Sequence, residues 1–402
     1  MRANPGGEID PKDVVGRDQF IQTFWQILDR QSVILVSERR MGKSCVIKKM
    51  RAEDADRHLI YYADVEGLET PLDFAERVCR DVDKHLTWRQ KTKSRANAVM
   101  KKVAGAEIGK LVKFPPAAAE LWRDLIEASL ADLAQHQPRQ VIFFWDELPL
   151  MLQKIAHTSG EPAAMAILDV LRSMRQTHGR VRMTYTGSIG LHHVLSTLRD
   201  AGHTNDATND MQTVELPPIS CDDAQFLAAQ LILGEDLECA DPLTTARSLA
   251  ELTDCIPFYI HQVILAMRNR GVSASTAIAA TIVQEALQHS QDPWHLRHFR
   301  ERLETYYGAN RVPIVLYLLD TLATEDCAVP LETLLKQFGA HFTRGTNKTV
   351  QQILQGDREP LRRILELLQA DHYVCRRAAD GAYMFRFPLI KRWWQFHRSL
   401  PC

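Results

Sequence analysis

The sequence predicts an α/β fold in which a parallel sheet is covered by helices and is followed by a helical lid and a winged-helix domain. Up to residue 219, short apolar runs of strand length alternate with helical patterns, which is typical of a parallel sheet. From Ser220 onward the pattern is almost purely helical. Two short β-patterned runs then flank Asp380-Gly381, a typical hairpin turn. We therefore expect an α/β domain over residues 1–219, a helical lid over 220–293 and a winged-helix domain over 294–402.

Composition limits the classes of function. At 402 residues the chain is too long for one core, and 45% hydrophobic and 25% charged residues are typical of a soluble globular protein. The formal net charge of −1 excludes a uniformly basic nucleic-acid binder. The 8 cysteines are scattered without a C-x-x-C pair, which predicts reduced thiols and neither a zinc site nor a disulfide framework. With no signal peptide and no apolar run longer than a strand, we expect a cytoplasmic protein that does not enter the membrane.

The stretch from Ser32 to Lys48 has the layout of a phosphate-binding loop. An apolar strand (residues 33–36) leads into a polar turn, and Lys43-Ser44 then open a helix. Backbone N–H groups at a helix N-terminus form a concave anion site, and the helix dipole favours negative charge there. In the consensus G-x-x-x-x-G-K-[ST], the lysine reaches the β- and γ-phosphates and the hydroxyl ligates Mg²⁺.

The alternative is an accidental G-K-S triplet in a strand–helix turn, and Ser37 replaces the first glycine of the consensus. Because the strand before and the helix after the loop are both present, we favour the phosphate loop. The predicted nucleotide contacts in this loop are Ser37, Glu38, Arg39, Arg40, Met41, Gly42, Lys43, Ser44 and Cys45.

A second acidic motif follows a buried strand. Residues 141–145 are apolar and end in Asp146-Glu147, so the two acids stand at the carboxyl edge of the sheet, where α/β folds bind ligands. We expect Asp146 and Ser44 to hold Mg²⁺, and Glu147 to act as the general base toward an attacking water. The alternative is a strand followed by an ordinary acidic turn.

Besides a strand over residues 59–65 and a helix over 161–177, two more strands are expected, over residues 181–186 and 212–216, of which the last is the fifth strand of the chain. Gly187-Ser188 end the first of them, and the Ser188 hydroxyl would lie beside the γ-phosphate or the attacking water. A plain Gly-Ser turn explains these two residues equally well. Pro217-Pro218 end the second strand and with it the sheet.

A basic insertion occupies residues 84–113. Its nine Lys and Arg residues face a single acid, Glu107, so the segment could touch a phosphate backbone. We favour the alternative, a solvated or mobile insertion. The C-terminal segment from residue 296 is also basic, with 16 Lys and Arg against 11 Asp and Glu.

Helices near 311–323, 330–338 and 358–369, followed by strands over 373–377 and 383–387, form the winged-helix pattern. If this domain binds DNA, its recognition helix and wing would supply the contacts; the alternative is that these arginines are solvated. The candidate DNA contacts are Arg358, Arg362, Arg363, Arg376 and Arg377.

Taken together, these motifs resemble the archaeal-type ATPases of the AAA+/STAND branch of P-loop NTPases. Residues 39–44 resemble that family's R-R-x-G-K-[ST] loop, and residues 141–147 resemble its Walker B strand. Residues 185–190 resemble its sensor-1 turn, and 387–394 resemble the end of its C-terminal winged helix. The resemblance spans residues 13–398 with the motifs in order.

The resemblance implies further site residues. Residues 15–18 resemble the V-G-R-[ED] box, which implies adenine contacts from Val15, Gly16 and Arg17. Residues 256–259 resemble the lid's G-x-P-x-Y element, which implies that Pro257 packs near the base. Cys255 stands where that element has glycine. The family's arginine finger would precede the fifth strand, where Arg199 is the nearest candidate. The implied catalytic residues are Glu147, Ser188 and Arg199.

We therefore expect a cytosolic ATPase that binds ATP or ADP with Mg²⁺ and uses slow or partner-stimulated hydrolysis as a conformational switch. The winged helix would couple this switch to double-stranded DNA or to a protein effector, and ATP could also drive homo-oligomerisation. One alternative is an interaction module that binds ATP without hydrolysing it. Another is a DNA-binding regulator whose affinity is tuned by ATP.

Overall fold

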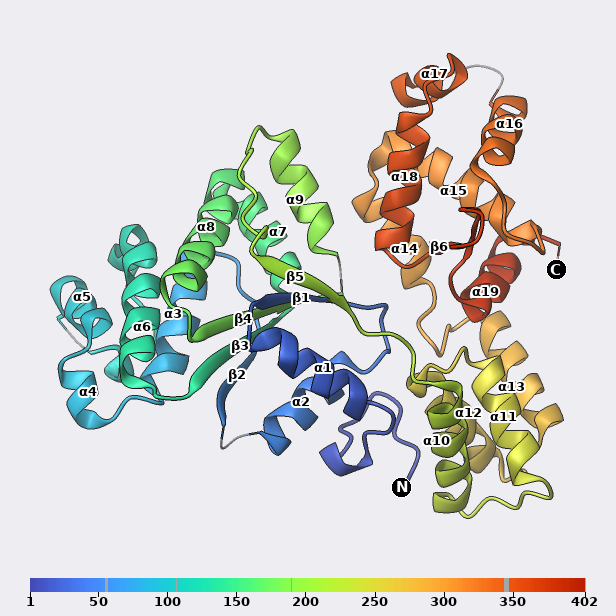
Figure 1. Ribbon diagram of the computed structural model, residues 1–402, viewed down its shortest axis with the longest axis horizontal. Coiled ribbons are helices and arrows are strands. Elements are labelled where there is room, and N and C mark those ends of the chain that lie inside the picture. The colour runs from blue at the N-terminus through green and yellow to red at the C-terminus, as the bar shows by residue number, and fades with distance from the viewer. Residues whose placement is uncertain (55–56, 106, 189, 343–346, 402) are drawn as a thin grey trace. The chain divides into compact units, whose positions relative to one another are not determined.

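The computed structural model describes residues 1–54, 57–105, 107–188, 190–342 and 347–401 (Figure 1). The chain divides into two compact units. We call residues 17–37 and 43–216 the sheet unit, and residues 1–16, 38–42 and 217–402 the helical unit. The five residues from Glu38 to Gly42 therefore belong to one unit, whereas the residues on either side belong to the other. The division into three domains stays a prediction.

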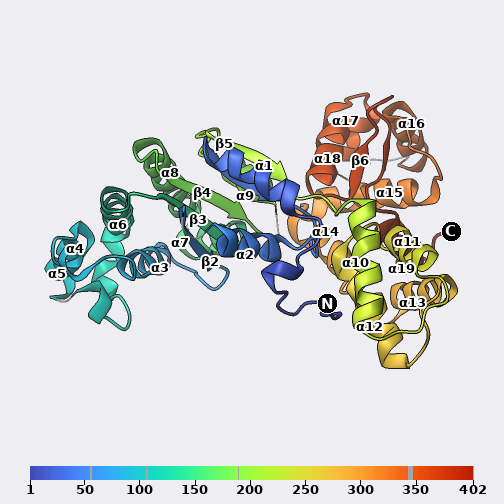
Figure 2. The same ribbon diagram turned by 60° about the horizontal axis from the view of Figure 1, so that its bottom comes forward.

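The sheet unit is built on five parallel strands in the order β2-β3-β4-β1-β5, with helices on both faces (Figures 1 and 2). This confirms the predicted α/β class with a parallel sheet. The strand β4 lies between β1, which leads into the phosphate loop, and β3, which ends in Asp146. The strands are β1 (Ser32–Val36), β2 (His58–Asp64), β3 (Gln140–Asp146), β4 (Val181–Thr186) and β5 (Met211–Glu215).

The central strands form because both faces of the sheet are covered. In β3, residues 141–146 are all buried, as expected for an interior parallel strand. Aromatic side chains fill the layer beside it: Tyr61 stacks on Phe143 with centroids 4.7 Å apart, and Phe143 stacks on Trp145 at 5.1 Å. The register that aligns Asp64 with Asp146 brings the two strands to an end at the same edge.

The α-helices of the sheet unit are α1 (Asp18–Leu28), α2 (Lys43–Glu53), α3 (Pro71–Asp83), α4 (Trp88–Thr92), α5 (Arg95–Ala104), α6 (Trp122–His136), α7 (Leu148–Ser159), α8 (Glu161–Thr177) and α9 (Leu191–Asp200). Short 3₁₀ segments occur at Ile108–Lys110 and Pro116–Leu121.

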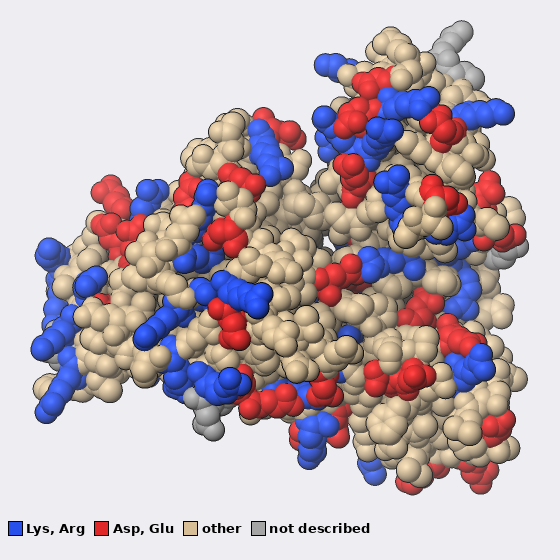
Figure 3. Space-filling view, viewed as in Figure 1, with Lys and Arg blue, Asp and Glu red and all other residues tan. Residues whose placement is uncertain are grey.

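The basic insertion contains two of these helices, α4 and α5. Thr87 caps α4 and Ser94 caps α5, and the Ser94 hydroxyl donates to Asp132 of α6 over 2.8 Å. Buried Ala96 and Met100 anchor α5. Lys and Arg side chains crowd the edge that α4 and α5 form (Figure 3). The insertion is therefore packed on α6, and its basic side chains form a solvated face.

The helical unit begins with a short 3₁₀ turn (Pro11–Asp13) and contains a helical bundle and a winged helix. The bundle consists of α10 (Cys221–Gly234), α11 (Pro242–Leu252), α12 (Pro257–Arg270) and α13 (Thr276–Gln288). The remaining elements are α14 (His298–Tyr306), α15 (Gly308–Thr324), α16 (Leu331–His341), α17 (Lys348–Leu354), α18 (Glu359–Ala370), β6 (Val374–Arg376), β7 (Tyr383–Phe385) and α19 (Pro388–Arg398).

The hairpin of the winged helix forms where the sequence predicts it. The strands β6 and β7 pair antiparallel, with Cys375 opposite Met384. Gly381 adopts φ +71°, a conformation that glycine takes without steric cost, and Val329 adds a further bridge to Tyr383. Within the described ranges, none of the helices has the length and apolar character needed to cross a membrane.

Candidate functional site

Polar groups gather at the carboxyl edge of the sheet unit. The strands β1, β3 and β4 run parallel, so the residues that follow them meet at this edge. Lys43 opens α2, and its Nζ donates to the carbonyl oxygen of Gly187 over 2.7 Å. The structure thus brings together three predicted site residues in one unit: Lys43, Glu147 and Ser188.

Glu147 occupies a strained position between β3 and α7. Its φ of +59° lies in the left-handed region, which is uncommon for a residue with a Cβ and is often found at functional sites. The backbone N–H and the hydroxyl of Ser188 both donate to Glu147 Oε2, over 2.9 and 2.8 Å. A Cβ at Gly187 would lie 2.9 Å from Pro149 Cδ and 3.3 Å from Glu147 Oε2, so this close approach requires glycine.

The environment of Glu147 alters its ionisation. Burial raises the pKa of Glu147, and the nearby Asp146 carboxylate adds to this effect. The two hydrogen bonds from Ser188 and the charge of Lys43 act in the opposite direction without cancelling it. A carboxylate whose pKa is raised toward neutrality is a better proton acceptor, as a general base requires.

Asp146 is held by a residue that the sequence reasoning missed. The hydroxyl of Tyr62, on β2, donates to Asp146 Oδ2 over 2.9 Å and also hydrogen-bonds Ser44. Burial and the Asp146 charge raise the pKa of Tyr62, so the phenol stays protonated. The sequence could have pointed to Tyr62 only through its position, two residues before the end of β2, the strand beside β3. Tyr62 therefore links the two predicted metal ligands.

These two ligands fit a magnesium ion. The hydroxyl of Ser44 and the carboxylate of Asp146 are hard oxygen donors, the type that Mg²⁺ prefers, and Mg²⁺ keeps several water ligands in such sites. Ser44 is exposed at the start of α2, and Asp146 retains limited exposure. The residues present thus match the chemistry of the predicted metal.

Glu38, in the loop before Lys43, is engaged inside the helical unit. Its buried carboxylate lies 3.2 and 3.3 Å from Arg302 Nη1 of α14, and 3.6 Å from the His298 ring. It also accepts the Arg39 backbone N–H over 2.6 Å. Burial opposes ionisation, but Arg302 and His298 outweigh it and lower the pKa of Glu38 to about 2. The carboxylate therefore stays ionised as half of a buried ion pair.

Arg302 also contacts residues of the winged helix. Arg302 Nη2 lies 3.4 Å from Asp371, which accepts the Tyr307 hydroxyl over 2.6 Å. The guanidinium also stands 5.6 Å from the ring centroid of Tyr373. We call Glu38, Arg302 and Asp371 the Glu38–Arg302 network. No sequence pattern indicates this network, because Glu38 and Arg302 stand 264 residues apart.

Arg40 joins the loop to the start of α12. Its guanidinium carbon lies 4.2 Å from the ring centroid of Phe258, the residue after Pro257. Arg40 has φ +71°, Met41 is buried, and Arg39 is exposed. The loop from Glu38 to Gly42 is therefore tied to the helical unit at Arg302 and at Phe258.

The predicted adenine-contact residues lie at the junction of the two units in the sequence. Gly16 has φ +69°, and a Cβ there would lie 2.7 Å from Asp223 Cβ of α10, so the position needs glycine. Val15 is half-buried, and buried Arg17 precedes α1. Burial raises the pKa of the Cys45 thiol, which favours its neutral form.

The remaining predicted residues lie on the surface. Arg199 is exposed in the last turn of α9. The five candidate DNA contacts are all exposed, and several engage neighbours: Arg358 pairs with Glu332, Arg363 with Glu359 and Arg377 with Asp380. Arg376 donates to the Gly381 carbonyl over 3.0 Å. Ile189, in the sensor-1 resemblance, lies outside the described residues.

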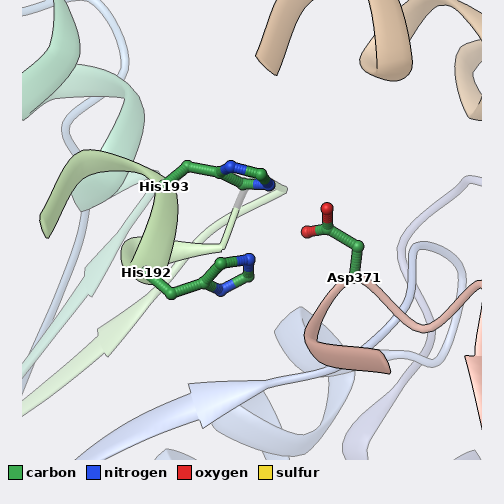
Figure 4. A group of neighbouring side chains, drawn as sticks. All are labelled: His192, His193 and Asp371. Carbon is green, nitrogen blue, oxygen red and sulfur yellow. The ribbon is translucent and has the colours of Figure 1, made fainter. Parts of the chain in front are cut away.

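Two histidines open α9, close behind Ser188 in the sequence. The rings of His192 and His193 have centroids 4.4 Å apart and are tilted by 38° (Figure 4). Asp371, labelled in the same figure, belongs to the helical unit and to the Glu38–Arg302 network.

Comparison with solved structures identifies the fold. A Walker-type ATPase of Pyrococcus abyssi aligns with a TM-score of 0.64 and 15% identity, covering 98% of this chain and 100% of that chain. The ORC2 protein of Aeropyrum pernix, in its ADPNP–ADP complexes, aligns with a TM-score of 0.52 and 11% identity, covering 98% and 97%. No protein-family model and no curated protein matches the chain. The likeness shows the AAA+ P-loop ATPase fold with a C-terminal winged helix, and the assignment to the STAND branch stays a prediction.

Proposed function

We propose that this chain, which has the fold of the AAA+ P-loop ATPases, binds ATP with Mg²⁺ and hydrolyses it as a conformational switch. The observation that carries this proposal is the carboxyl edge of the sheet unit, where Lys43, Glu147 and Ser188 come together next to Asp146. A cation, a carboxylate that can hold a metal and a half-buried carboxylate that can accept a proton are the groups that phosphoryl transfer to water uses.

Each residue has a distinct role. Lys43 would exchange its hydrogen bond to Gly187 for the β- and γ-phosphates and neutralise their charge. Glu147 would accept the proton of the attacking water, and Ser188 holds the Glu147 carboxylate in one orientation through two hydrogen bonds. Ser44 and Asp146 would hold Mg²⁺, which supplies positive charge to the phosphate oxygens when bound.

The switch rests on the path of the chain. The loop segment from Glu38 to Gly42 belongs to the helical unit, while Ser37 and Lys43 belong to the sheet unit. A phosphate bound to this loop would therefore contact the backbone of a segment whose side chains are engaged elsewhere: Glu38 pairs with Arg302, and Arg40 lies over Phe258. We infer that nucleotide binding changes the Glu38–Arg302 network and so reaches the winged helix. Double-stranded DNA, a protein effector or a second copy of the chain would respond to that change.

A non-hydrolysing module is the second candidate. The observation that favours it is that residues 201–210, the loop before β5, contain no arginine, and the nearest one is Arg199 in the last turn of α9. An ATPase that lacks an arginine finger of its own hydrolyses slowly until a partner supplies one. We therefore expect slow basal turnover, and complete absence of turnover would favour the module.

Nucleotide binding is tested with Lys43→Ala and a fluorescent ATP analogue. The matched control is Lys48→Ala, which removes an exposed lysine one turn further along the same helix. We expect Lys43→Ala to weaken binding at least about 100-fold, because it removes the cation that faces the β- and γ-phosphates. Lys48→Ala should bind like the wild type. Equal binding by wild type and Lys43→Ala, with unchanged circular dichroism, would overturn the phosphate-loop assignment.

A further inference from the structure

Two cysteine thiols of the helical unit lie next to each other. The Cys255 thiol donates to the sulfur of Cys221, with 3.5 Å between the two sulfur atoms. Cys221 is exposed and is the first residue of α10, whereas Cys255 is buried in the turn between α11 and α12. Seven cysteines are described and all are free thiols; Cys402 lies outside the described residues. An exposed thiol in contact with a buried one is the arrangement of a redox-active pair.

The backbone at Cys255 is unfavourable for a cysteine. Asp254 has φ +52° and Cys255 has φ +54°, so two consecutive residues with side chains occupy the left-handed region. Glycine takes this conformation at no steric cost, whereas a residue with a Cβ does not. Strain of this kind persists where the rest of the structure holds it, and it often marks a functional position. At Cys255, the feature that a glycine could not supply is the thiol.

The surrounding contacts hold the two thiols in place. The backbone N–H of Ile219 donates to the carbonyl oxygen of Cys255 over 3.3 Å, which joins the segment before α10 to the strained turn. On the other side, Asp254 Oδ2 accepts the backbone N–H of Leu389 over 2.7 Å. The turn is thus fixed between α10 and α19, and a bond between the two sulfurs requires only a short local approach.

We propose that Cys221 and Cys255 are a peroxide-sensitive pair that converts reversibly between two thiols and a disulfide. The sulfur of exposed Cys221 attacks one oxygen of hydrogen peroxide, the O–O bond breaks, and a sulfenic acid and one water form. The sulfur of Cys255 then attacks the Cys221 sulfur, and the hydroxyl group leaves as a second water with the thiol proton. The two thiols lose two electrons and two protons, which one peroxide takes up. A dithiol reductant reverses the reaction.

The order of the two steps follows from the environments. Burial, followed by the contact with Cys221, raises the pKa of the Cys255 thiol to about 12, so this thiol reacts less readily with peroxide than an exposed one, and it gives up its proton only in the second step, to the hydroxyl group that leaves. Cys221 is exposed, so peroxide reaches it first. Cys255 is therefore the resolving partner.

The disulfide would tie the start of α10 to the turn before Pro257, joining residues 34 apart in the sequence. A cross-link of this kind restricts the unfolded chain and raises the melting temperature. It would also fix the turn that the resemblance places near the adenine base. An effect of oxidation on nucleotide affinity rests on the proposed function, whereas formation of the disulfide does not.

The test uses the full-length chain, reduced and freed of reductant, treated with hydrogen peroxide and then alkylated and digested. Mass spectrometry should find a peptide that links Cys221 to Cys255, and the oxidised protein should melt at a higher temperature than the reduced protein. A dithiol should reverse both changes. Cys327→Ser, which removes another exposed thiol, is the matched control and should give the same cross-link.

A second variant protects the test against misfolding. Cys255→Gly suits the left-handed backbone, so its reduced form should melt at the same temperature as the wild type or higher, and it should form no cross-link. The proposal is overturned if peroxide drives wild-type Cys221 to sulfinic acid without a cross-link. A cross-link to any other cysteine would overturn it as well. None of these measurements uses nucleotide, so a failure here leaves the proposed ATPase untouched.

Discussion

Two glutamates of the predicted nucleotide site differ in what surrounds them. Glu147 accepts hydrogen bonds from Ser188 at the edge of the sheet, and burial raises its pKa. Glu38 lies beside Arg302 in the helical unit, where that charge outweighs burial and lowers its pKa to about 2. One carboxylate is prepared to accept a proton, and the other is held ionised.

The difference shows that a motif position does not define a role. Both residues are acids that were predicted as site residues; Glu38 lies in the phosphate loop and is buried, whereas Glu147 follows β3 and is half-buried. A general base needs a raised pKa and donors that release easily, which describes Glu147. A carboxylate that an arginine holds ionised serves instead to fix one segment against another, which describes Glu38. Under the proposed function, the chemistry therefore belongs to the sheet unit and the coupling to the Glu38–Arg302 network.

The largest effect on stability should come from breaking that network. Arg302→Met leaves Glu38 and Asp371 buried without their guanidinium, and we expect a loss of about 3–5 kcal/mol in urea unfolding. Arg247→Met is the matched control, because Arg247 pairs with Glu251 on the exposed face of α11 and should matter little. The double variant Glu38→Gln/Arg302→Met should lose less than Arg302→Met alone. Equal losses in Arg302→Met and Arg247→Met would contradict a coupled buried network.

A smaller effect should appear in the pH dependence of stability. Burial raises the pKa of Asp254 from 3.8 to about 6, against the hydrogen bond from Leu389 and the charge of Arg392. A raised pKa means that the folded state favours the protonated acid. The stabilisation is therefore complete below pH 3.8 and is lost as the pH rises through about 6.

Asp254→Asn should flatten the melting temperature between pH 4 and 6, an effect of at most about 3 kcal/mol from the size of the shift. Glu38→Gln should change stability at lower pH. A lowered pKa means that the ionised Glu38 carboxylate stabilises the folded state above pH 4.5, and this stabilisation is lost as the pH falls toward 2. If Asp254→Asn melts with the same pH profile as the wild type, the acid is not buried in solution.

The smallest effect is expected at the winged helix. Charge reversal at Arg362 and Arg363 should weaken binding to arbitrary duplex DNA and flatten its salt dependence by about one or two phosphate contacts, if the domain holds DNA. Arg358→Glu is a comparison variant, since Arg358 pairs with Glu332. A gel shift at low salt measures this. No shift for the wild type would remove DNA from the candidate partners and leave a protein effector or a second copy.

Sequence reasoning found several elements with clear periodicity and missed two helices that follow strands of the sheet. The predicted helix over 161–177 and strand over 181–186 have the observed bounds of α8 and β4. The helices α7 and α9 were not predicted; Glu147 and Gly190 precede them without a side-chain cap, but Gly160 precedes the predicted α8 without one as well.

For the site, sequence reasoning reached the residues close to the motifs and no others. Lys43, Asp146, Glu147 and Ser188 follow strand ends, and parallel pairing alone predicts that they meet. Tyr62 and Arg302 lie in no motif. Their roles depend on contacts across 84 and 264 residues, which periodicity does not encode.

The most direct test of the account compares ATP binding and ATP turnover in Glu147→Gln. The substitution keeps the shape of the side chain and removes the base, so it should affect the transition state and leave ground-state binding nearly unchanged. We expect near wild-type affinity for ATP and a fall in single-turnover hydrolysis of about 100-fold or more. Wild-type hydrolysis no faster than that of Glu147→Gln, at equal affinity, would contradict the assignment of chemistry to this edge and leave a chain that binds ATP without hydrolysing it.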